Sequence, residues 1–497
     1  MPGCHVLALD LGSSGVRSYL GVFDGSRLDL TLIHEQANGP VRVSGHWYWN
    51  ILGLHETILA AMREAARRTG GRPFTVGIET WGVDFGLIDS RGELLSPVYH
   101  YRDPRTHDLF PEVFERISDE ALYAVTGVPS LAINTLVQLY WTATRRPWIV
   151  EHAESLLFTP DLLTYFLTRE RRNELTIAST SQLLDPKLRQ WAEPVIEKLG
   201  FPRRLFQPIV FPGQWSASLL RRVQEDHGLP DGISVISVAS HDTACAVAAT
   251  PMTEAGHSVF LSAGTWALLG IELPEPIRTP ESHRAGFTNE LGVDGVVLFH
   301  QVLSGLWLLQ ECRREWMAAE GRTIGYDELD AAACQAPARA HLFNPQEGRF
   351  LSPLRMAAEI GAWFKERGLP APSTRGELVR AMYDSLALSY RHAIDQLERV
   401  TGERITTIHL VGGGARSRLF CETVANATGR QVVAGPATAT ALGNALLQLI
   451  AQGEIADLRQ GREVIRASCS LAVYEPAETS AWQEAYDWWL HNVLDAK

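Results

Sequence analysis

The sequence contains few cysteines, and their spacing argues against two kinds of site. Only six occur among 497 residues, and no two of them form a CxxC pair. A disulfide framework or a cysteine-based zinc site would need closely spaced pairs. Scattered thiols favour a reducing compartment, so we expect a cytoplasmic protein. The six are Cys4, Cys245, Cys312, Cys334, Cys421 and Cys469.

Long hydrophobic runs and an excess of positive charge are also absent. No window holds about 18 consecutive apolar residues, so the sequence predicts no membrane-spanning helix. The N-terminal stretch MPGCHVLALDLG has no basic segment, and we therefore expect no signal peptide. The net charge of -12 argues against nucleic acid or a membrane surface as partner. An anionic nucleotide stays possible, because backbone N–H groups can bind phosphate.

The stretch ISVISVASHDTAC, residues 233–245, places polar side chains at the end of an apolar run. Its β-branched residues predict a buried strand. Ser240, His241, Asp242 and Thr243 follow, where open α/β sheets bind ligands. A carboxylate beside a histidine and a hydroxyl can take a proton from a bound alcohol. Alternatively, Ser240 or Asp242 caps a helix that starts here.

The N-terminal region predicts two strands, 6–9 and 18–23, joined by the turn DLGSSG at 10–15. Small residues let backbone N–H groups approach a phosphate, and the serine hydroxyls add donors. An ordinary hairpin loop is the alternative. No GK[ST] follows, so this turn is not a Walker A loop.

A second strand end, after residues 75–78, carries Glu79, Trp81, Gly82 and Asp84. Carboxylates can bind sugar hydroxyls, and an aromatic ring can face the C–H side of a sugar. The alternative is a tryptophan that only packs in the structure.

The pattern of the first half returns after residue 251. Strands are expected at 259–261 and 267–271 around the turn SAGT, and 407–411 ends in a glycine triplet at 412–414. The triplet either brings a ligand against the backbone or forms a bare tight turn. Two halves with the same plan indicate duplicated α/β domains with a cleft between them. We expect domains at 1–248 and 249–455, with a helical tail at 456–497.

Helices are expected at 51–69, 374–400 and 417–428. The first has apolar residues at helical spacing and stops at a glycine pair. The second begins with a capping box formed by Thr374 and Glu377.

Taken together, several motifs resemble the FGGY carbohydrate kinases over residues 6–455, nearly the whole chain. The resemblance implies two actin- or hexokinase-like (ribonuclease H-like) α/β domains. The motifs are GIETWGVDF (77–85), YRDPRT (101–106), SHDTA (240–244), SAGTW (262–266), GLWLLQ (305–310) and the run 409–446 with VGGG and AGP.

The resemblance implies an ATP-dependent kinase in which Asp242 is the catalytic base. Asp10 would lie near Mg²⁺, through water. The implied sugar contacts are Gly82, His241, Asp242 and Thr243. The implied ATP contacts are Ser13, Ser14, Gly15, Val16, Arg17, Thr265, Gln310 and Gly413. The expected partners are ATP and a ketose, L-rhamnulose, and the chain is expected to be a monomer or a homodimer.

Three departures from the family pattern concern the substrate. Val302 stands where an asparagine contacts the sugar in similar kinases, Glu79 replaces a more usual aspartate, and the nucleotide turn reads SSGVR. Other ketoses, L-fuculose or L-xylulose, are therefore alternatives, because one hydroxyl contact can change specificity strongly. A non-catalytic sugar- or nucleotide-binding regulator is the alternative from a different class.

Overall fold

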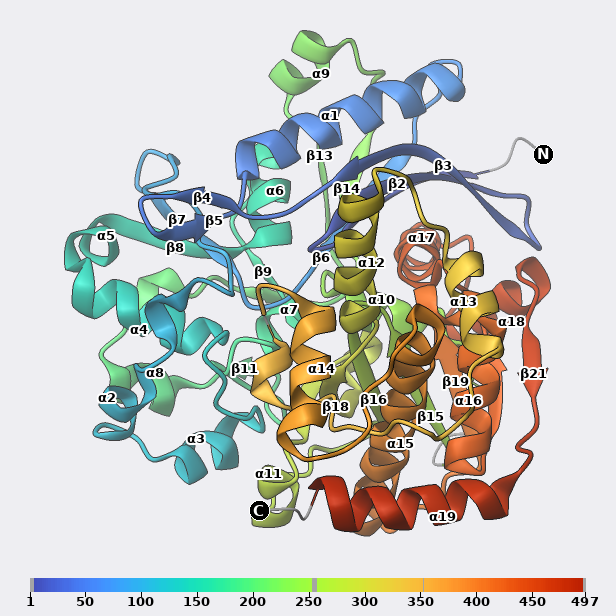
Figure 1. Cartoon of the computed structure of the whole chain (residues 1–497). Helices are drawn as coiled ribbons and strands as arrows, with labels where there is room; N and C mark the ends of the chain where they lie inside the picture. The colour runs from blue at the N-terminus through green and yellow to red at the C-terminus, as the bar shows by residue number, and fades with distance from the viewer. Residues whose placement is uncertain (1–3, 253–256, 352, 495–497) are drawn as a thin grey trace. The chain divides into compact units, whose positions relative to one another are not determined.

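The computed structural model describes residues 4–252, 257–351 and 353–494 (Figure 1). The chain divides into two compact units. The first comprises Met1–Pro251, Glu272–Phe299 and Ala439–Ser468, and the second comprises Met252–Ile271, His300–Thr438 and Cys469–Lys497. Each unit thus joins segments that are distant in sequence. The expected boundaries after residues 248 and 455 stay predictions.

A six-stranded sheet forms the centre of the first unit. Strand β1 runs antiparallel to β2 and parallel to β6, and β14 runs parallel to β6. The carboxyl ends of β1, β6 and β14 therefore meet at one edge. In sheet order, the strands are β13 (Ser216–Ser218), β14 (Ser234–Ile236), β6 (Thr75–Thr80), β1 (Cys4–Leu11), β2 (Gly15–Phe23) and β3 (Leu28–Ala37).

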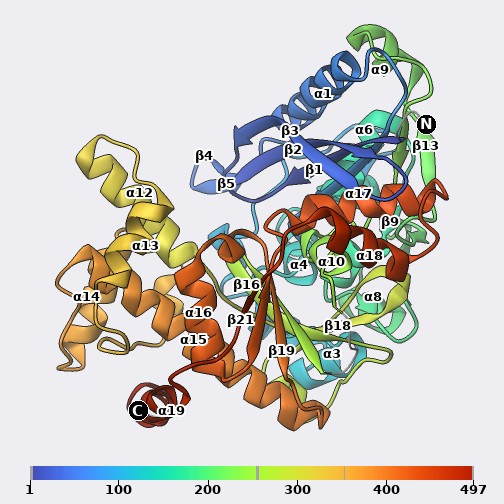
Figure 2. The same cartoon turned by 90° about the vertical axis from the view of Figure 1, so that its right-hand side faces the viewer.

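Helices lie on both faces of this sheet, α1 (Ile51–Arg68) on one and α17 (Ala439–Ala451) on the other (Figure 2). The apolar residues of α1 recur at helical spacing and pack into the core of the unit. The Asn50 side chain caps its first turn by accepting from the Gly53 N–H at 3.1 Å.

Two amides fix α17 on the sheet. Asn444 donates to the Gly77 carbonyl of β6 at 3.1 Å, and Gln448 donates to the Leu7 carbonyl of β1 at 3.0 Å. At Gly443 an added Cβ would lie only 1.9 Å from the Cys245 carbonyl oxygen. Glycine there lets α17 approach α10 (Asp242–Ala248), the helix that begins at the expected catalytic residue.

The remaining elements of the first unit surround this layered core. They are β4 (Val41–Val43), β5 (His46–Tyr48), β7 (Phe85–Asp89), α2 (Phe110–Phe114), α3 (Asp119–Thr126), α4 (Thr135–Arg145), α5 (Pro147–His152), β8 (Ala153–Phe158), α6 (Thr159–Thr168), β9 (Asn173–Glu174), α7 (Leu175–Ser179), β10 (Leu184–Asp185), β11 (Gln190–Trp191), α8 (Glu193–Leu199), β12 (Ile209–Val210), α9 (Arg221–His227), α11 (Pro280–Arg284), β17 (Thr288–Leu291) and α18 (Leu458–Ser468).

The second unit repeats the plan of the first. Strand β15 (Ser258–Ala263) is antiparallel to β16 (Trp266–Leu273) and parallel to β19 (Thr407–Val411). The expected duplication of α/β domains is therefore confirmed. Strands β16 and β18 cross the boundary between the units. The unit also contains the second part of β18 (Val297–Ser304), together with β20 (Gln431–Ala434), β21 (Ala472–Tyr474), α12 (Trp307–Glu320), α13 (Tyr326–Cys334), α14 (Met356–Glu366), α15 (Arg375–Thr401), α16 (Arg418–Thr428) and α19 (Thr479–Trp489).

The long helix α15 confirms its predicted capping box. The Thr374 hydroxyl accepts from the Glu377 N–H, and the Glu377 carboxylate accepts from the Thr374 N–H. In the expected tail, β21 pairs with β20, so this region contributes a strand as well as helices. Its last three residues lie outside the described part. Within the described ranges, no helix has the length and apolar character needed to cross a membrane.

Candidate functional site

Three carboxylates gather at the carboxyl edge of the first unit's sheet. Asp10 on β1 and Glu79 on β6 are in register, and Asp242 begins α10 after β14. Burial raises the pKa of Asp10 to about 7; the Asp242 charge adds to the rise and Arg17 opposes it. Burial also raises the pKa of Glu79 well above its usual value, with contributions from Asp10 and Asp242. The three carboxylates are therefore close enough for the charge of one to raise the pKa of another.

Asp242 has a carboxylate that is partly exposed, whereas Glu79 is fully buried. The Asp242 side chain keeps 35% exposure, and the Thr243 hydroxyl donates to its Oδ1 at 3.2 Å. Burial raises the pKa of Asp242, and His241 opposes the rise. The helix-cap alternative is wrong, because the N-cap residue is His241 and it makes no side-chain cap bond. A reachable carboxylate with a raised pKa is a suitable proton acceptor.

His241 lies between two carboxylates. Its Nε2 is 3.4 Å from Oδ1 of Asp242, and its Nδ1 is 3.2 Å from Oε2 of Glu290. Burial alone would lower the pKa of His241, but the charges of Glu290 and Asp242 outweigh burial and raise it. Each ring nitrogen thus faces an acidic side chain, and the imidazole stands directly beside the expected base.

The buried carboxylate of Glu174 holds the backbone of the same segment. It caps α7 by accepting from the N–H groups of Thr176 and Ile177, and it also accepts from the Ser240 N–H at 3.1 Å. The Thr176 hydroxyl accepts from the His241 N–H at 3.2 Å. Burial raises the pKa of Glu174 to about 7, against the effect of its donors.

The other end of α7 reaches two further parts of the site. The Thr180 hydroxyl accepts from the Val83 N–H at 3.1 Å, and a Cβ on Gly82 would lie 3.1 Å from that same oxygen. The Ser179 hydroxyl accepts from the Leu291 N–H at 2.8 Å. Residues 174–180 therefore contact the segments that carry Gly82, His241 and Glu290, and so align them.

The turn between β1 and β2 is tight and anchored. The Gly12 N–H donates to the Gly15 carbonyl at 2.9 Å, and the Asn38 side chain donates to the Gly12 carbonyl at 2.9 Å. The backbone N–H of Asn38 donates to the Ser14 carbonyl at 3.2 Å. The side chain of Ser14 is exposed and that of Ser13 is partly exposed, so both hydroxyls can be reached from solvent.

Two residues that follow this turn, at the start of β2, present different groups to a phosphate. Val16 is fully buried in the core, so only its backbone could contact a nucleotide. The exposed Arg17 pairs with Glu35 at 2.9 Å. A phosphate would have to compete with that carboxylate for the guanidinium.

The second unit brings together the turn SAGT and the start of α12. The Thr265 hydroxyl donates to Oε1 of Gln310 at 3.1 Å, and the Leu306 N–H donates to the Gly264 carbonyl at 2.8 Å. A Cβ on Gly305 would lie 2.5 Å from the Trp266 carbonyl carbon, so only glycine allows this approach.

The glycine triplet lies against the same turn. Gly412 has φ +83°, where glycine is favoured, and an added Cβ would lie 3.2 Å from the Ala263 carbonyl oxygen. A Cβ on Gly414 would lie 2.8 Å from Cβ of Ala263. Gly413 stands between them, so the three expected ATP contacts of this unit share one surface region.

The residues near Asp10 suit a magnesium ion. Carboxylate oxygens are the protein ligands that Mg²⁺ prefers, and it usually takes one or two of them together with phosphates and water. No group of three or more His, Cys, Asp and Glu side chains in the described ranges could hold a metal ion by itself. The carboxylate of Asp10 thus fits an ion that also binds phosphates and water.

Trp81 and Asp84 belong to the interior of the first unit. Both oxygens of Asp84 are occupied, because Oδ2 accepts from the indoles of Trp49 at 2.6 Å and Trp81 at 2.9 Å, and Oδ1 accepts from Gln138 at 3.0 Å. The two indoles stack with centroids 3.8 Å apart. Trp81 keeps only 5% exposure, which supports the alternative of a structural tryptophan.

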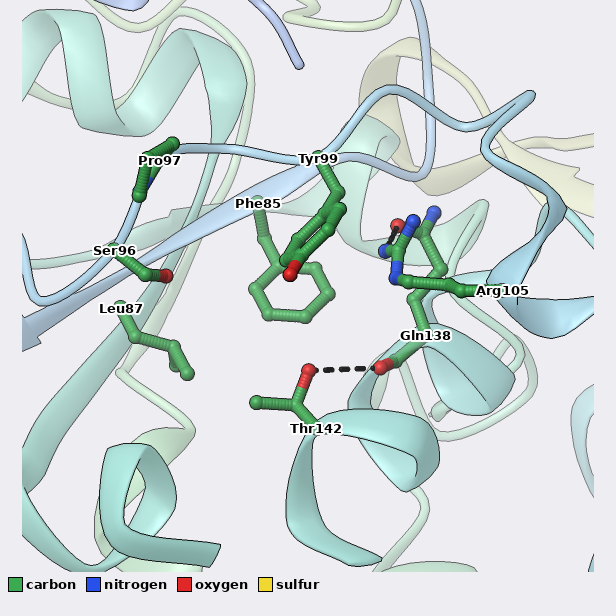
Figure 3. Close-up of a pocket in the computed structure, with 8 residues that line it drawn as sticks. All are labelled: Phe85, Leu87, Ser96, Pro97, Tyr99, Arg105, Gln138 and Thr142. Atoms are coloured by element: carbon green, nitrogen blue, oxygen red, sulfur yellow. Dashed lines mark hydrogen bonds between the residues drawn. The ribbon is translucent and has the colours of Figure 1, made fainter. Parts of the chain in front are cut away.

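A small cavity borders this network (Figure 3). Its volume is about 20 Å³, which leaves room for about one water molecule. Figure 3 shows the Arg105 guanidinium beside the Tyr99 ring, and Arg105 donates to Gln138 at 2.6 Å. The cavity contains none of the expected site residues. It is lined by Phe85, Leu87, Ser96, Pro97, Tyr99, Arg105, Gln138 and Thr142.

Sequence reasoning missed Glu174, Thr180 and Glu290. Glu174 and Thr180 lie in a polar stretch with no motif of its own, and Glu290 follows an ordinary Thr-Asn pair. Polar residues beside a helix start were the only available signal. Their contacts with Ser240, Val83 and His241 join segments between 49 and 97 residues apart, which no local pattern reveals.

Comparisons with known proteins agree with this architecture. Residues 5–248 match the profile of the FGGY family of carbohydrate kinases, N-terminal domain, and residues 259–452 match the C-terminal domain of the same family. A rhamnulokinase of Bacteroides thetaiotaomicron is 38% identical over 97% of this chain and 98% of its own length. A rhamnulokinase of Bacillus subtilis is 33% identical, covering 95% of each chain.

Two solved structures share the fold at low sequence identity. A ligand-bound xylulose kinase from Lactobacillus acidophilus superimposes with a TM-score of 0.82 at 15% identity, over 99% of both chains. A glycerol kinase from Plasmodium falciparum with ADP gives 0.79 at 14% identity, over 99% of this chain and 98% of that one. The expected actin- or hexokinase-like pair of domains is therefore confirmed.

Proposed function

Because the chain belongs to the FGGY family of carbohydrate kinases, we propose that it phosphorylates the C1 hydroxyl of L-rhamnulose with ATP. The product would be L-rhamnulose 1-phosphate, formed in the breakdown of L-rhamnose. The observation that supports this sugar is the full-length likeness to rhamnulokinases at 33–38% identity. The likeness to xylulose and glycerol kinases supports the fold alone.

Asp242 is the proposed general base. Its carboxylate accepts the proton of the C1 hydroxyl as that oxygen bonds to the γ-phosphorus and the bond from phosphorus to the β-γ bridging oxygen breaks. Two features support this role: the side chain is partly exposed, and burial raises its pKa. The proposed sugar contacts are Gly82, His241 and Thr243, and the last two contact this carboxylate.

The ATP contacts are proposed from two sets of donors. In the first unit, the anchored turn offers the hydroxyls of Ser13 and Ser14 and the side chain of Arg17, with the backbone of Gly15 and Val16. In the second unit, Thr265 and Gln310 are hydrogen-bonded to each other beside Gly413. Phosphoryl transfer requires mainly positioning and neutralisation of charge, which such donors supply.

Asp10 is the proposed residue that holds Mg²⁺, through water. When bound, the ion would neutralise phosphate charge. Asp10 would orient the water molecules between the ion and the protein. Five cysteines within the described ranges are free thiols, which favours the proposed cytoplasmic location; they are Cys4, Cys245, Cys312, Cys334 and Cys421.

A coupled assay of ADP release tests the function. Wild-type protein is given L-rhamnulose, L-fuculose, L-xylulose, D-xylulose and glycerol in turn. We expect the highest kcat/KM with L-rhamnulose. Preference for another ketose would contradict the proposed sugar but not the kinase activity. Absence of ADP release with every sugar, while ATP still binds, would support the regulator alternative.

Because of Val302, other ketoses are a second group of candidate substrates. The Val302 side chain is 38% exposed on β18 and cannot form the hydrogen bond that an asparagine would offer at this position. If it faces the sugar, the loss of one polar contact changes specificity between ketoses. The sugar panel separates these candidates directly.

A further inference from the structure

Glu290 stands behind His241, on the side opposite Asp242. Its Oε2 lies 3.2 Å from Nδ1, while Nε2 on the far side of the ring lies 3.4 Å from Asp242. The Glu290 and His241 side chains are each only 9% exposed. The carboxylate therefore has little access to solvent or substrate, but it contacts the ring that stands beside the proposed base.

The strand that carries Glu290 is fixed on both sides of this residue. Asn289 donates through its backbone and its side chain to the Gly127 carbonyl, at 3.0 Å in each case. The Leu291 N–H donates to the Ser179 hydroxyl at 2.8 Å. A carboxylate on a strand held this firmly can impose an orientation on its partner.

We propose that Glu290 is a positioning residue, which fixes the His241 ring through Nδ1 so that Nε2 faces Asp242 and the sugar. This inference rests on the proposed function of the same site. In the proposed arrangement, Nδ1 carries a proton that interacts with Glu290, and Nε2 is left for the reacting side. Orientation of a histidine by a carboxylate on its other nitrogen is a general way to choose the tautomer and the ring angle.

The charges around His241 agree with this arrangement. Glu290, Asp242 and Glu174 all favour the protonated ring, and Glu290 contributes most among them. Glu290 therefore acts on both the angle and the charge of the imidazole. Loss of its carboxylate would release the ring and weaken the interaction of Nε2 with the reacting groups.

Two substitutions separate these effects. Glu290→Ala removes both the acceptor and the charge, and Glu290→Gln keeps an oxygen that can accept from Nδ1. We expect kcat with L-rhamnulose to fall about 10- to 100-fold in Glu290→Ala and by less in Glu290→Gln, while the KM for ATP changes less than twofold. A kcat within twofold of wild type in both variants would overturn the proposal.

Histidine-selective ¹⁵N NMR of the free protein gives a readout independent of activity. We expect a slowly exchanging Nδ1–H signal of His241, assigned with His241→Gln, which shifts in Glu290→Gln and is lost in Glu290→Ala. An unchanged signal in both variants would contradict the pairing. If the wild type phosphorylates no sugar, the proposed function fails, yet this signal still reports on the pair.

Tyr123→Phe is a matched control for general damage around this strand. The Tyr123 hydroxyl donates to the Phe287 carbonyl at 2.8 Å, just before β17, and it does not contact His241. We expect this variant to lose stability but to keep kcat and the His241 signal. Equal loss of kcat in Tyr123→Phe and Glu290→Ala would assign Glu290 a purely structural role and overturn the proposal.

Discussion

Burial and charge act in opposite directions on Asp242. Burial raises the pKa of its carboxyl, and the neighbouring His241 limits the rise. A base must be ionised before the reaction and yet basic enough to accept a proton, so its pKa works best near the working pH. The surroundings of Asp242 move its pKa upward, in that direction.

The first prediction concerns Asp242→Asn. We expect kcat to fall by about 10²-fold or more, because the amide cannot accept the proton, while ATP binding persists. The measurements are ADP release with saturating L-rhamnulose and titration calorimetry with ATP. Asp226→Asn, which alters an exposed carboxylate on α9, is the control and should leave both unchanged. Turnover within threefold of wild type in Asp242→Asn would contradict the assignment of the base.

Asp84 shows how a buried acid links stability to pH. Burial raises its pKa to about 6 from a usual 3.8, although Gln138 and the two indoles lower it. The fold therefore favours the protonated carboxyl. This contribution to stability is fully present below the unfolded pKa and is lost as pH rises through the folded one. Over that window, the loss amounts to about 3 kcal/mol.

The second prediction follows for Asp84→Asn. The variant should be less stable at low pH, because the amide cannot reproduce every bond of the carboxyl. Its free energy of unfolding should then fall less steeply than that of wild type between pH 4 and 6. Urea unfolding at a series of pH values measures both curves, with Asp226→Asn as reference. Parallel curves for Asp84→Asn and wild type would show that the pKa of Asp84 is not raised.

At the scale of elements, the short helix α7 and its two capping residues contact three segments of the candidate site. Its capping carboxylate, Glu174, also binds the backbone of the segment that carries Asp242. Its last hydroxyls bind the backbone beside Gly82 and beside Glu290. One helix therefore aligns three strand ends, and a change there should act on catalysis and stability together.

The third prediction is that Glu174→Ala destabilises the protein by at least about 2 kcal/mol, because several buried N–H groups lose their acceptor. It should also lower kcat, since the Ser240 N–H is one of them. Urea unfolding and ADP release measure the two effects. Glu174→Gln keeps an acceptor and should lie between wild type and Glu174→Ala. Glu193→Ala, at the exposed start of α8, should change neither.

At the scale of the whole molecule, the sequence predicted the elements that depend on local patterns. The strands around each turn follow from apolar periodicity, and α15 follows from its capping box and its glycine stop. The repeated plan of strand, small-residue turn and strand predicted the duplication. Such features are visible in sequence because each is determined within about twenty neighbouring residues.

Other features depend on contacts between distant segments. Asp84 could not be recognised as an internal acceptor, because its donors Trp49 and Gln138 lie 35 and 54 residues away. The sequence also did not predict that residues 439–468 belong to the first unit. Asn444 and Gln448 hold this segment there, through bonds to distant strands. The proposed role of Glu290 depends on its contact with His241, which lies 49 residues earlier in the chain. Topology, and not local propensity, determines these pairs.

We propose that the first unit binds the sugar and the second unit binds ATP, and substitution of Thr265 tests this proposal. The Thr265 hydroxyl bonds Gln310 in the second unit, whereas the proposed base lies in the first. We expect Thr265→Ala to raise the KM for ATP about 5- to 10-fold, the loss of one hydrogen bond, with little change in the KM for sugar. Initial rates with each substrate varied in turn measure both constants.

Thr265→Ser keeps the hydroxyl and should have a KM for ATP near that of wild type. An unchanged KM for ATP in Thr265→Ala would remove Thr265 from the nucleotide site, whereas an equal rise in both constants would show that the units do not divide the substrates.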